Sequence, residues 1–474
     1  MVNWRGYGNY WNCNKIIRLN HNKIIKFEKT NKIIRLKEKI KMILTKLKEE
    51  LKNKQILILG FGAEGQDNYK FLRKLFPDKI LGIGDCKEFS IFNFQFSKLL
   101  KEDKYLKLHL GKNYLKTTQD YDVIFKSPGI PFKILPKTIL KKITSQTKIF
   151  FDYCPGKIIG IAGTKGKGTT SSLIYKILKQ AGLNAYLIGN IGRPVLSFLS
   201  KAKKDDIFVY ELSSYQLMNL KKSPQIAVFL NNYPDHLDYH KNLQEYARAN
   251  GKITQYQTKK DFLIYNPQDE IVKKIANKSK AKKIPIKGKH YFVNKEAAKT
   301  VGKIFNISPK IISKAIKKLK PLPYRLELIG KFHEIIFYND SASTIPETTI
   351  AALDFLKNKV ETLILGGSDK NLNFKFLAQK ILKSKVKVLI LFPITGRQIW
   401  QEIIKISGEQ FSAKLSKYFF VDNMPEAVKL AYQHTSKGKI CLLSPASASF
   451  SIFKDYRHRG SLFTKYVQKY SQGN

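Results

Sequence analysis

Residues 157–170, with the sequence KIIGIAGTKGKGTT, constrain the fold of this chain more than any other stretch. An apolar run changes abruptly into a glycine-rich loop that carries lysines and paired threonines. The run predicts a buried strand, the glycines allow backbone N–H groups to turn inward, and Thr169 onward predicts the start of a helix. A strand, such a loop and a helix in this order are typical of a phosphate-binding site.

The loop is predicted to hold the phosphates of ATP. Lys167 would lie near the β and γ phosphates, and Thr169 or Thr170 would offer a hydroxyl to Mg²⁺. The match to G-x-x-x-x-G-K-[ST] is imperfect, because Ile161 stands at the first glycine and Gly168 follows the lysine directly. A flexible lysine-rich turn is the alternative interpretation. The predicted ATP-binding residues of the loop are Gly163, Thr164, Lys165, Gly166, Lys167, Gly168, Thr169 and Thr170.

The charge of the chain is its unusual compositional feature. Lysine and arginine total 86 against 36 aspartates and glutamates, a formal net charge of +50. Such an excess suggests a nucleic-acid partner. We do not expect one, because the lysines are spread along the whole chain, outnumber the arginines and form no single stripe. A genome-wide lysine bias explains them at least as well.

The cysteines and the hydropathy limit the compartment. Cys13, Cys86, Cys154 and Cys441 are far apart and form no CxxC pair, which argues against a disulfide framework or a zinc site. No apolar run reaches the roughly 18 residues of a membrane span, and the basic start lacks the apolar core of a signal peptide. These features predict a protein of the reducing cytoplasm with no membrane span.

The 474 residues are enough for about three domains, preceded by an extension. NKIIRL at 14, NKIIKF at 22 and NKIIRL at 31 form a basic, low-complexity repeat within residues 1–36. Residues 37–52 predict an amphipathic helix. The first domain is then expected over 37–149, the second over 150–323 and the third over 324–474, with the prolines of KAIKKLKPLP as a hinge.

A second glycine pattern opens the first domain. QILILGFGAEG predicts a strand followed by Gly60-x-Gly62-x-x-Gly65, and the next strand, KILGIGD, ends at Asp85. Glycines at this spacing permit close approach of a diphosphate, and an acid about 20 residues on meets a ribose or base. A plain strand–helix turn is the alternative. DVIFKSPGIP adds a further strand, whose loop at Ser127 should reach the same sheet edge.

Polar residues follow two strands of the second domain. Glu211 ends DIFVYE, and Asp235 and His236 follow QIAVFLNN. Carboxylates at such strand ends commonly hold the Mg²⁺ of a nucleotide. Taken singly, Glu211 could be a solvated edge acid and His236 a hydrogen-bonded structural histidine. Strands and helices alternate again in the third domain, which predicts a smaller α/β unit.

The motifs GTKGKGTT, ELSSYQL and DHLDYH, with GFGAEG and SPGIP, resemble the Mur ligase family of peptidoglycan synthesis over about residues 54–470. The resemblance implies a three-domain α/β fold: a Rossmann-like nucleotide domain, a central P-loop ATPase domain with a mostly parallel sheet, and a C-terminal Rossmann-like domain. It further implies an ATP-dependent amide ligase that uses Mg²⁺ and adds D-glutamate to UDP-N-acetylmuramoyl-L-alanine through an acyl phosphate. SPASASF and GGSDK favour glutamate as the added amino acid. A monomer is expected.

The resemblance also assigns site residues. The catalytic ones are Lys167, Glu211, His236 and Lys370. Thr169, Glu211 and His236 would hold the metal, and Arg325 and Asp340 would contact ATP. The UDP substrate would be bound by Gly60, Gly62, Gly65, Asp85, Cys86, Ser127, Asn190 and Ser213. Glutamate would be bound by Thr344, Lys370, Ser449, Phe450 and Tyr456.

Two positions depart from the family pattern. Asn250 stands where the family carries a carbamylated lysine that bridges two Mg²⁺ ions, and Ala342 stands where some members carry a lysine. Lys252 is a poor replacement, because two residues rotate a helical side chain by about 200°. Either the helix is locally distorted, or the second metal is held without a carbamate. Our hypothesis for Asn250 is that metal binding is independent of CO₂.

Other classes of protein remain open at this point. A folylpolyglutamate-type ligase would lack the fold from Gly60 to Asp85, and another Mur-type ligase would add a different amino acid or a dipeptide. A nucleic-acid-dependent NTPase would show steeply salt-dependent stimulation by DNA or RNA. A dinucleotide oxidoreductase would leave the ATP loop unexplained. The sequence does not distinguish D-glutamate from L-glutamate.

Overall fold

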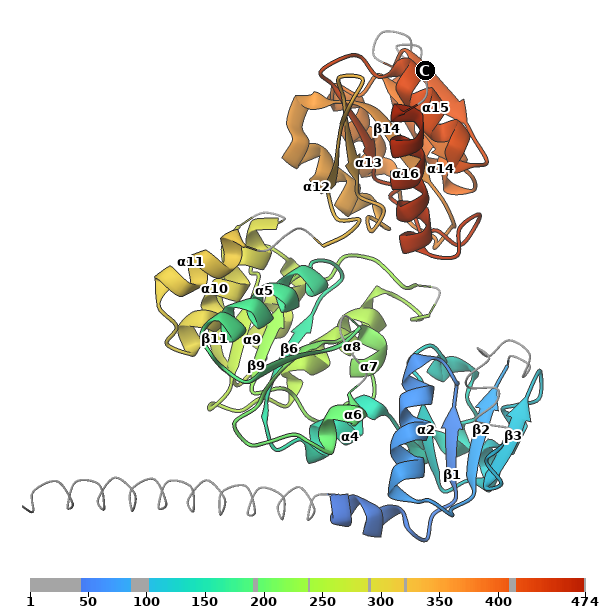
Figure 1. Ribbon diagram of the computed structural model, residues 1–474, viewed down its shortest axis with the longest axis vertical. Coiled ribbons are helices and arrows are strands. Elements are labelled where there is room, and N and C mark those ends of the chain that lie inside the picture. The colour runs from blue at the N-terminus through green and yellow to red at the C-terminus, as the bar shows by residue number, and fades with distance from the viewer. Residues whose placement is uncertain are drawn as a thin grey trace, which may run out of the picture. The chain divides into compact units, whose positions relative to one another are not determined.

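The computed structural model describes residues 44–86, 102–190, 195–237, 239–288, 291–318, 322–408 and 415–472 (Figure 1). The repeats of residues 1–36 lie outside the described residues, as do positions 37–43 of the predicted first helix. Residues 44–51 are helical, as predicted, and bury Leu47 and Leu51. Contacts group the chain into two compact units, unit 1 (1–157 and 193–207) and unit 2 (158–192 and 208–474).

Unit 1 is built on a five-stranded sheet of order β3-β2-β1-β4-β5, in which every pair is parallel. Its strands are β1 (Ile56–Leu59), β2 (Leu81–Asp85), β3 (Leu106–Leu110), β4 (Val123–Lys126) and β5 (Ile143–Thr144). All four residues of β1 are buried, because the central strand of a parallel sheet is covered on both faces. The carboxyl ends of β1, β2 and β4 therefore meet at one edge.

Short helical segments surround this sheet. They are α2 (Ala63–Leu75), η2 (Lys116–Asp120), η3 (Phe132–Ile134), η4 (Lys137–Lys142), α4 (Gln146–Tyr153) and α6 (Leu196–Leu199). The segment 193–207, far along the sequence, belongs to this unit: the Asp67 carboxylate on α2 accepts the N–H of Leu196 at 3.1 Å. Burial raises the pKa of Asp67.

Unit 2 holds two six-stranded sheets. The central sheet has the order β11-β10-β9-β6-β8-β7. Its strands are β6 (Lys157–Ala162), β7 (Ala185–Gly189), β8 (Ile207–Glu211), β9 (Ile226–Phe229), β10 (Phe262–Tyr265) and β11 (Lys282–Pro285). Its helices are α5 (Lys167–Gln180), α7 (Ser214–Leu217), α8 (Leu243–Gln255), α9 (Glu270–Asn277), α10 (Tyr291–Ile304) and α11 (Pro309–Lys317).

The second sheet of unit 2 has the order β12-β13-β17-β14-β15-β16, and β12–β13 is its antiparallel pair. Its strands are β12 (Glu327–Phe332), β13 (Ile335–Asn339), β14 (Val360–Gly366), β15 (Val388–Phe392), β16 (Lys417–Phe420) and β17 (Ile440–Leu443). Its helices are α12 (Pro346–Leu356), η5 (Lys357–Lys359), α13 (Lys375–Lys383), α14 (Thr395–Ser407), α15 (Met424–His434) and α16 (Tyr456–Ser471).

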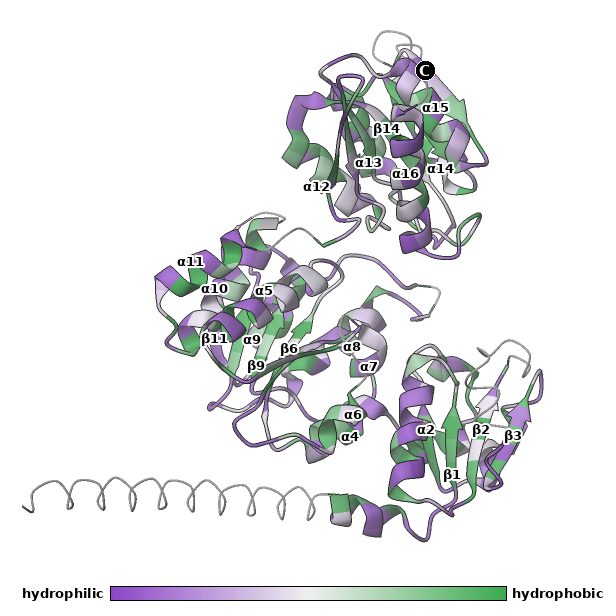
Figure 2. Ribbon diagram, in the orientation of Figure 1, coloured by the Kyte–Doolittle hydropathy of each residue, from purple (hydrophilic) through white to green (hydrophobic). Residues whose placement is uncertain are grey.

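The alternation of side chains along β14 divides the core of this last sheet. Leu363 and Leu365 pack with α12, α13 and α14, whereas Ile364 packs with α15 and α16 on the opposite face. Figure 2 shows the result, with strands mostly hydrophobic and the outward sides of the helices hydrophilic. The α/β class and the strands predicted from the apolar runs are confirmed. Among the described residues, no helix is both long and apolar enough to cross a bilayer.

Candidate active site

The phosphate loop lies between β6 and α5, as the sequence predicted, but the helix begins at Lys167 and not at Thr169. The reason is Gly166, which caps the helix with a φ of +87°. A Cβ there would stand 2.3 Å from Oδ1 of Asn294, so the turn excludes larger residues. The early start places Lys167 in the first turn, with its backbone at the positive end of the helix dipole.

Asn231 holds the loop in shape. Its Oδ1 accepts the backbone N–H of Lys165 at 2.8 Å, and its Nδ2 donates to the carbonyl of Lys165 at 3.0 Å. The Asn231 carbonyl accepts the N–H of Thr164 at 3.1 Å. Sequence reasoning missed this residue, although the asparagine pair at the end of QIAVFLNN was a usable signal. These bonds from Asn231 hold the loop at Thr164 and Lys165, and they do not involve the backbone N–H groups of Gly163 and Gly166.

Lys167, at the end of the loop, and Glu211, at the end of β8, are charged groups that act on each other's pKa. Lys167 Nζ donates to the carbonyls of Gly163 at 2.6 Å and Thr164 at 3.0 Å. Burial lowers the pKa of Lys167 to about 8. Glu211 is buried at the end of β8, and within the described residues its Oε2 has no hydrogen-bond partner. Burial raises the pKa of Glu211, and the charge of Lys167 opposes the rise.

The two threonines after Lys167 differ. Thr170 Oγ1 donates to Oδ1 of Asn294 at 3.2 Å, so that hydroxyl already supports the loop. Thr169 is buried at the same end of α5 and remains the metal ligand that the sequence predicts. Asn294, on α10, is a second functional residue that sequence reasoning missed, and we find no sequence signal for it.

His236 follows β9 with a left-handed φ of +58°. Its Nδ1 lies 2.6 Å from the hydroxyl of Tyr215 on α7, and its backbone N–H donates to Oδ1 of Asp235 at 2.9 Å. Burial lowers the pKa of His236 to about 4, so the imidazole is neutral at neutral pH. Where Nδ1 donates to Tyr215, Nε2 keeps its lone pair for a metal ion.

Asp235 gathers residues from both sheets of unit 2. Its Oδ2 lies 3.3 Å from Lys165 Nζ, and its Oδ1 lies 3.4 Å from Lys370 Nζ. Lys165 Nζ also donates to Oγ1 of Thr344 at 2.8 Å. These cations and His236 hold the pKa of Asp235 far below its usual value, although burial alone would raise it. Thr344 and Lys370, which the sequence assigned to glutamate binding, therefore contact residues of the phosphate-loop region.

The remaining predicted residues around the last sheet lie on its loops or, for Tyr456, at the start of a helix. Asp340, after β13, accepts the N–H of Leu326 at 3.0 Å and the hydroxyls of Ser343 and Ser444, and burial raises its pKa to about 6. The charge of Arg325 lowers the pKa of Asp340 and that of Glu211. Ser449 is buried and Phe450 is exposed, both after β17, and Tyr456 begins α16.

Arg459, which sequence reasoning missed, ties three strand ends of this sheet together. Its fully buried guanidinium donates to Oγ and the carbonyl of Ser341 at 3.0 and 2.9 Å, and to the carbonyl of Ser447 at 3.1 Å. It also reaches the carbonyls of Ala448 at 3.3 Å and Gly366 at 3.5 Å. The loops that carry Thr344, Lys370 and Ser449 share this one anchor.

Unit 1 brings its predicted substrate residues to one sheet edge. Asp85 Oδ2 accepts the N–H of Phe61 at 2.6 Å, and Ser127 Oγ donates to the carbonyl of Gly60 at 2.6 Å. A Cβ at Gly65 would stand 2.1 Å from that same carbonyl, which explains the glycine. Gly62 caps α2, and Cys86 is exposed after β2. Asn190 and Ser213 belong to unit 2, so their role with these residues stays a prediction.

A buried lysine, Lys126, lies in the same unit as these predicted substrate residues. Lys126, at the end of β4, donates to the carbonyls of Ser127 at 3.0 Å and Ile130 at 2.7 Å, and its ammonium stands 4.6 Å from the ring centre of Phe132. Burial lowers its pKa to about 8. Sequence reasoning missed it, because a lysine in so lysine-rich a chain carries no signal.

The departures from the family pattern have a structural counterpart. Asn250 is buried on α8, and its Nδ2 donates to Oδ1 of Asn232 at 2.9 Å. Lys252 instead reaches the hydroxyl of Tyr256 at 3.1 Å. The two side chains thus have different surroundings, as the helical rotation predicted. Ala342 lies in the loop after β13.

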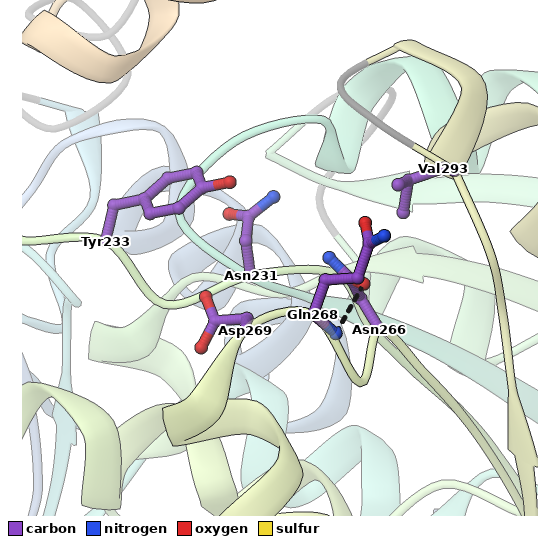
Figure 3. A pocket seen from close by; sticks show the side chains of 7 residues that line it. Asn231, Tyr233, Asn266, Gln268, Asp269 and Val293 are labelled. Carbon is purple, nitrogen blue, oxygen red and sulfur yellow. Dashed lines mark hydrogen bonds between the residues drawn. The ribbon is translucent and has the colours of Figure 1, made fainter.

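A cavity of about 320 Å³ adjoins Asn231 (Figure 3). Its lining includes the amide side chains of Asn231, Asn266 and Gln268, together with Tyr233 and Asp269. Asn266 Oδ1 accepts the backbone N–H of Gln268 at 3.1 Å, drawn as a dashed line. The cavity is rich in groups that can both donate and accept hydrogen bonds, as a heterocyclic base requires.

The predicted metal ligands, Thr169, Glu211 and His236, fit a divalent cation in part. The orphaned oxygen of Glu211 is the donor type that Mg²⁺ prefers. In the described part of the chain, no three histidine, cysteine, aspartate or glutamate side chains group closely enough to hold a metal. A cation at Glu211 would therefore need hydroxyl, phosphate or water oxygens as further ligands.

Comparison with known proteins gives the family. Residues 161–339 match the model of the Mur ligase middle domain. The chain is 32% identical over 470 residues to the UDP-N-acetylmuramoylalanine--D-glutamate ligase of Acetivibrio thermocellus, covering 90% of this chain and 98% of that one. It is 31% identical over 464 residues to the ligase of the same name from Ruminiclostridium cellulolyticum, with the same two coverages.

Solved structures agree with the fold. MurF from Acinetobacter baumannii gives a TM-score of 0.54 at 15% identity, over 68% of this chain and 79% of that chain. UDP-N-acetylmuramate-alanine ligase MurC from Thermotoga maritima gives 0.53 at 15% identity, over 89% and 100%. With a phosphate loop, the motifs that flank it and full-length relatives above 30% identity, the chain belongs to the Mur ligase family.

Proposed function

We propose that this protein is the ATP-dependent ligase that joins D-glutamate to UDP-N-acetylmuramoyl-L-alanine in peptidoglycan precursor synthesis. The relatives that it matches over nearly their whole length carry the name of that activity. The observation that carries the proposal is the Asp235 cluster, which puts Lys165 of the phosphate loop beside Thr344 and Lys370. Phosphoryl chemistry and amino-acid binding would then share one place.

The activation step needs charge compensation. A carboxylate is a poor electrophile, and its negative charge repels the triphosphate that must phosphorylate it. The carboxylate oxygen of the substrate would attack the γ-phosphorus, ADP would leave, and an acyl phosphate would form. Lys167 would exchange its bonds to the carbonyls of Gly163 and Thr164 for bonds to phosphate oxygens.

The amide step then uses the activated carbonyl. The amine of glutamate attacks the acyl carbon, and phosphate leaves with the electron pair of its C–O bond. Lys370 would pair with a carboxylate of the amino acid, and Thr344, with Ser449, Phe450 and Tyr456, would complete its site. Exclusion of water is essential here, because hydrolysis of the acyl phosphate would waste ATP.

Thr169, Glu211 and His236 would hold Mg²⁺, which supplies charge neutralisation on the triphosphate when bound. The cavity beside Asn231 would take the adenine, because that residue links its wall directly to the phosphate loop. In unit 1, Gly60, Gly62, Gly65, Asp85, Cys86 and Ser127 would hold the UDP moiety. Asp85, whose Oδ2 fixes the turn, would meet a ribose or base of that moiety.

The test is phosphate release from ATP and Mg²⁺ with UDP-N-acetylmuramoyl-L-alanine, in parallel with D-glutamate, L-glutamate and no amino acid. We expect turnover that requires both substrates and a product heavier by one glutamate residue by mass spectrometry. Turnover with D-glutamate but not with L-glutamate would establish the stereochemistry of the added residue. ATP hydrolysis that ignores both substrates and rises with nucleic acid would overturn the proposal.

A further inference from the structure

The amide step needs a proton acceptor that the residues assigned so far do not supply. At neutral pH the incoming amine is an ammonium group, whose nitrogen has no lone pair. A base must take a proton before that nitrogen can attack a carbonyl. The base must lie near the Asp235 cluster, where Lys165, Lys370 and Thr344 meet.

The groups already placed in the cluster are poorly suited to this task. The cations around Asp235 keep its carboxylate ionised and weakly basic. His236 has a pKa lowered to about 4, and its Nδ1 is engaged with Tyr215. Glu211 lies beside Lys167 of the phosphate loop, where the metal would bind. Lys165 and Lys370 act as hydrogen-bond donors to Asp235 or Thr344.

Glu347 is a further carboxylate on which the charges of Lys165 and Asp235 act. It stands three residues after Thr344, in the first turn of α12, and is partly buried. Its Oε2 is shielded from solvent and has no hydrogen-bond partner among the described residues. The carboxylate accepts a hydrogen bond from its own backbone N–H, which leaves this second oxygen for an external donor.

The electrostatic surroundings of Glu347 suit a base. The positive charge of Lys165 and the negative charge of Asp235 both act on it, and Glu347 in turn acts on the phenol of Tyr233. Burial is the largest influence and raises the pKa of Glu347, whereas Lys165 and the backbone N–H lower it. A carboxylate whose pKa is raised by burial accepts a proton more readily than an exposed one.

We propose that Glu347 is the base that accepts the proton of the incoming amino group. The inference rests on the proposed function. The N–H bond of the ammonium breaks and its first proton passes to Oε2 of Glu347. The freed electron pair forms the C–N bond of a tetrahedral intermediate. The C–O bond to phosphate then breaks, and phosphate leaves with the electron pair of that bond and takes the second N–H proton, which gives the neutral amide. Glu347 then returns its proton to water.

The test compares two nucleophiles in wild type and in Glu347→Gln, which keeps the shape of the side chain. Hydroxylamine is largely unprotonated at neutral pH and needs no base, and it traps an acyl phosphate as a hydroxamate. We expect Glu347→Gln to lower kcat with D-glutamate about 100-fold or more and to leave hydroxamate formation near the wild-type rate. Glu334→Gln, at an exposed acid paired with Lys437, is the matched control and should change neither rate.

Three results would count against Glu347. Wild-type rates with both nucleophiles would overturn its role. Equal loss with both, in a variant that unfolds like wild type, would place the side chain in an earlier step and also overturn it. A raised KM for glutamate with unchanged kcat would make it a binding residue. Glu347→Asp, which retains a carboxylate, should keep part of the kcat and its fall at low pH.

Failure of the proposed function gives a different result. In that case wild type would form neither hydroxamate nor amide from UDP-N-acetylmuramoyl-L-alanine, whatever residue stands at 347. The two hypotheses are therefore separated by the wild-type arm alone.

Discussion

Lys126 in unit 1 and Lys167 in unit 2 have almost the same local structure. Lys126 is buried and Lys167 is partly buried, and each donates to two carbonyls of a loop at the end of a parallel strand. Desolvation lowers the pKa of each to about 8. The charge of a glutamate acts on each of them, Glu64 on Lys126 and Glu211 on Lys167. The difference lies in their place: Lys126 ends β4 and packs on the ring of Phe132, whereas Lys167 begins α5 directly after the phosphate loop.

A lysine bonded to loop carbonyls can therefore either stabilise the conformation of the loop or be available to act on a substrate. In unit 1 the loop is closed by its own groups, since Asp85 and Ser127 bond the turn after β1. In unit 2 the phosphate loop is held by Asn231, and the buried Oε2 of Glu211 has no hydrogen-bond partner among the described residues. We therefore expect Lys126 to be structural and Lys167 to be catalytic.

The largest expected difference is that between the kcat values of variants that lack one or the other of the two ammonium groups. Lys167→Met should lower kcat about 100- to 1,000-fold, because the charge on the transferring phosphoryl group loses a preorganised donor. Lys126→Met should leave kcat within about threefold. ADP release at saturating substrates measures both, with circular dichroism to show that each variant is folded. Equal losses would abolish the distinction between the two lysines.

The next prediction tests whether the turn after β1 in unit 1 is held in one conformation by its own groups. Gly65→Ala would place a Cβ 2.1 Å from the carbonyl of Gly60, so the turn must move. We expect a loss of about 3 kcal/mol in the free energy of unfolding and weaker UDP binding. Gly62→Ala is the matched control for stability, because a Cβ there meets nothing within 4 Å. Urea unfolding and calorimetry with UDP measure the two effects, and equal stability of the variants would contradict the clash.

A smaller effect concerns pH. The pKa of Lys126 is about 8 in the folded chain and 10.5 as the ordinary value, so the unfolded state binds more protons between these values. Stability from this group is therefore lost as pH falls from about 10.5 to 8 and regained as pH rises. Relative to Lys126→Met, wild type should gain on the order of 1 to 2 kcal/mol between about pH 7.5 and 9.5. A flat difference in urea unfolding would mean that Lys126 is solvated.

The smallest expected effect is none. Because Asn250 bonds Asn232 and Lys252 reaches Tyr256, the described structure offers no lysine at the carbamate position. Depletion of bicarbonate should leave the activity and the Mg²⁺ affinity of wild type unchanged. Recovery of lost activity on simple addition of bicarbonate would show that the charge around Lys167 needs a carbamate after all.

Much of the site could be predicted from the sequence, because its signals are local. Lys167 and Gly166 belong to one strand–loop–helix pattern, and Glu211 and His236 follow apolar runs that form strands. The carboxyl ends of parallel strands meet at one edge, so these residues were expected together. The helix start was wrong by two residues, since the sequence does not show that Gly166 adopts a positive φ.

Other contacts could not have been predicted this way. Asn231 and Arg459 act through backbone carbonyls or amides that lie far away in sequence, and no short pattern records such bonds. Lys126 bonds carbonyls only one and four residues further on, but a single lysine carries no signal in so lysine-rich a chain. The cation cluster around Asp235 joins loops that are more than 100 residues apart. Glu347 was an ordinary first-turn acid in the sequence.

The sequence by itself determined the α/β class, the two glycine-rich loops and the family, because periodicity, glycine spacing and motif order are properties of neighbouring residues. The tertiary structure alone decided which charges are buried and which stay unpartnered. Burial and partnership depend on every element that packs around a group, and they set the pKa and the free lone pairs on which the chemistry depends. That is why we expect different roles for Lys126 and Lys167, although their bonds to loop carbonyls look alike.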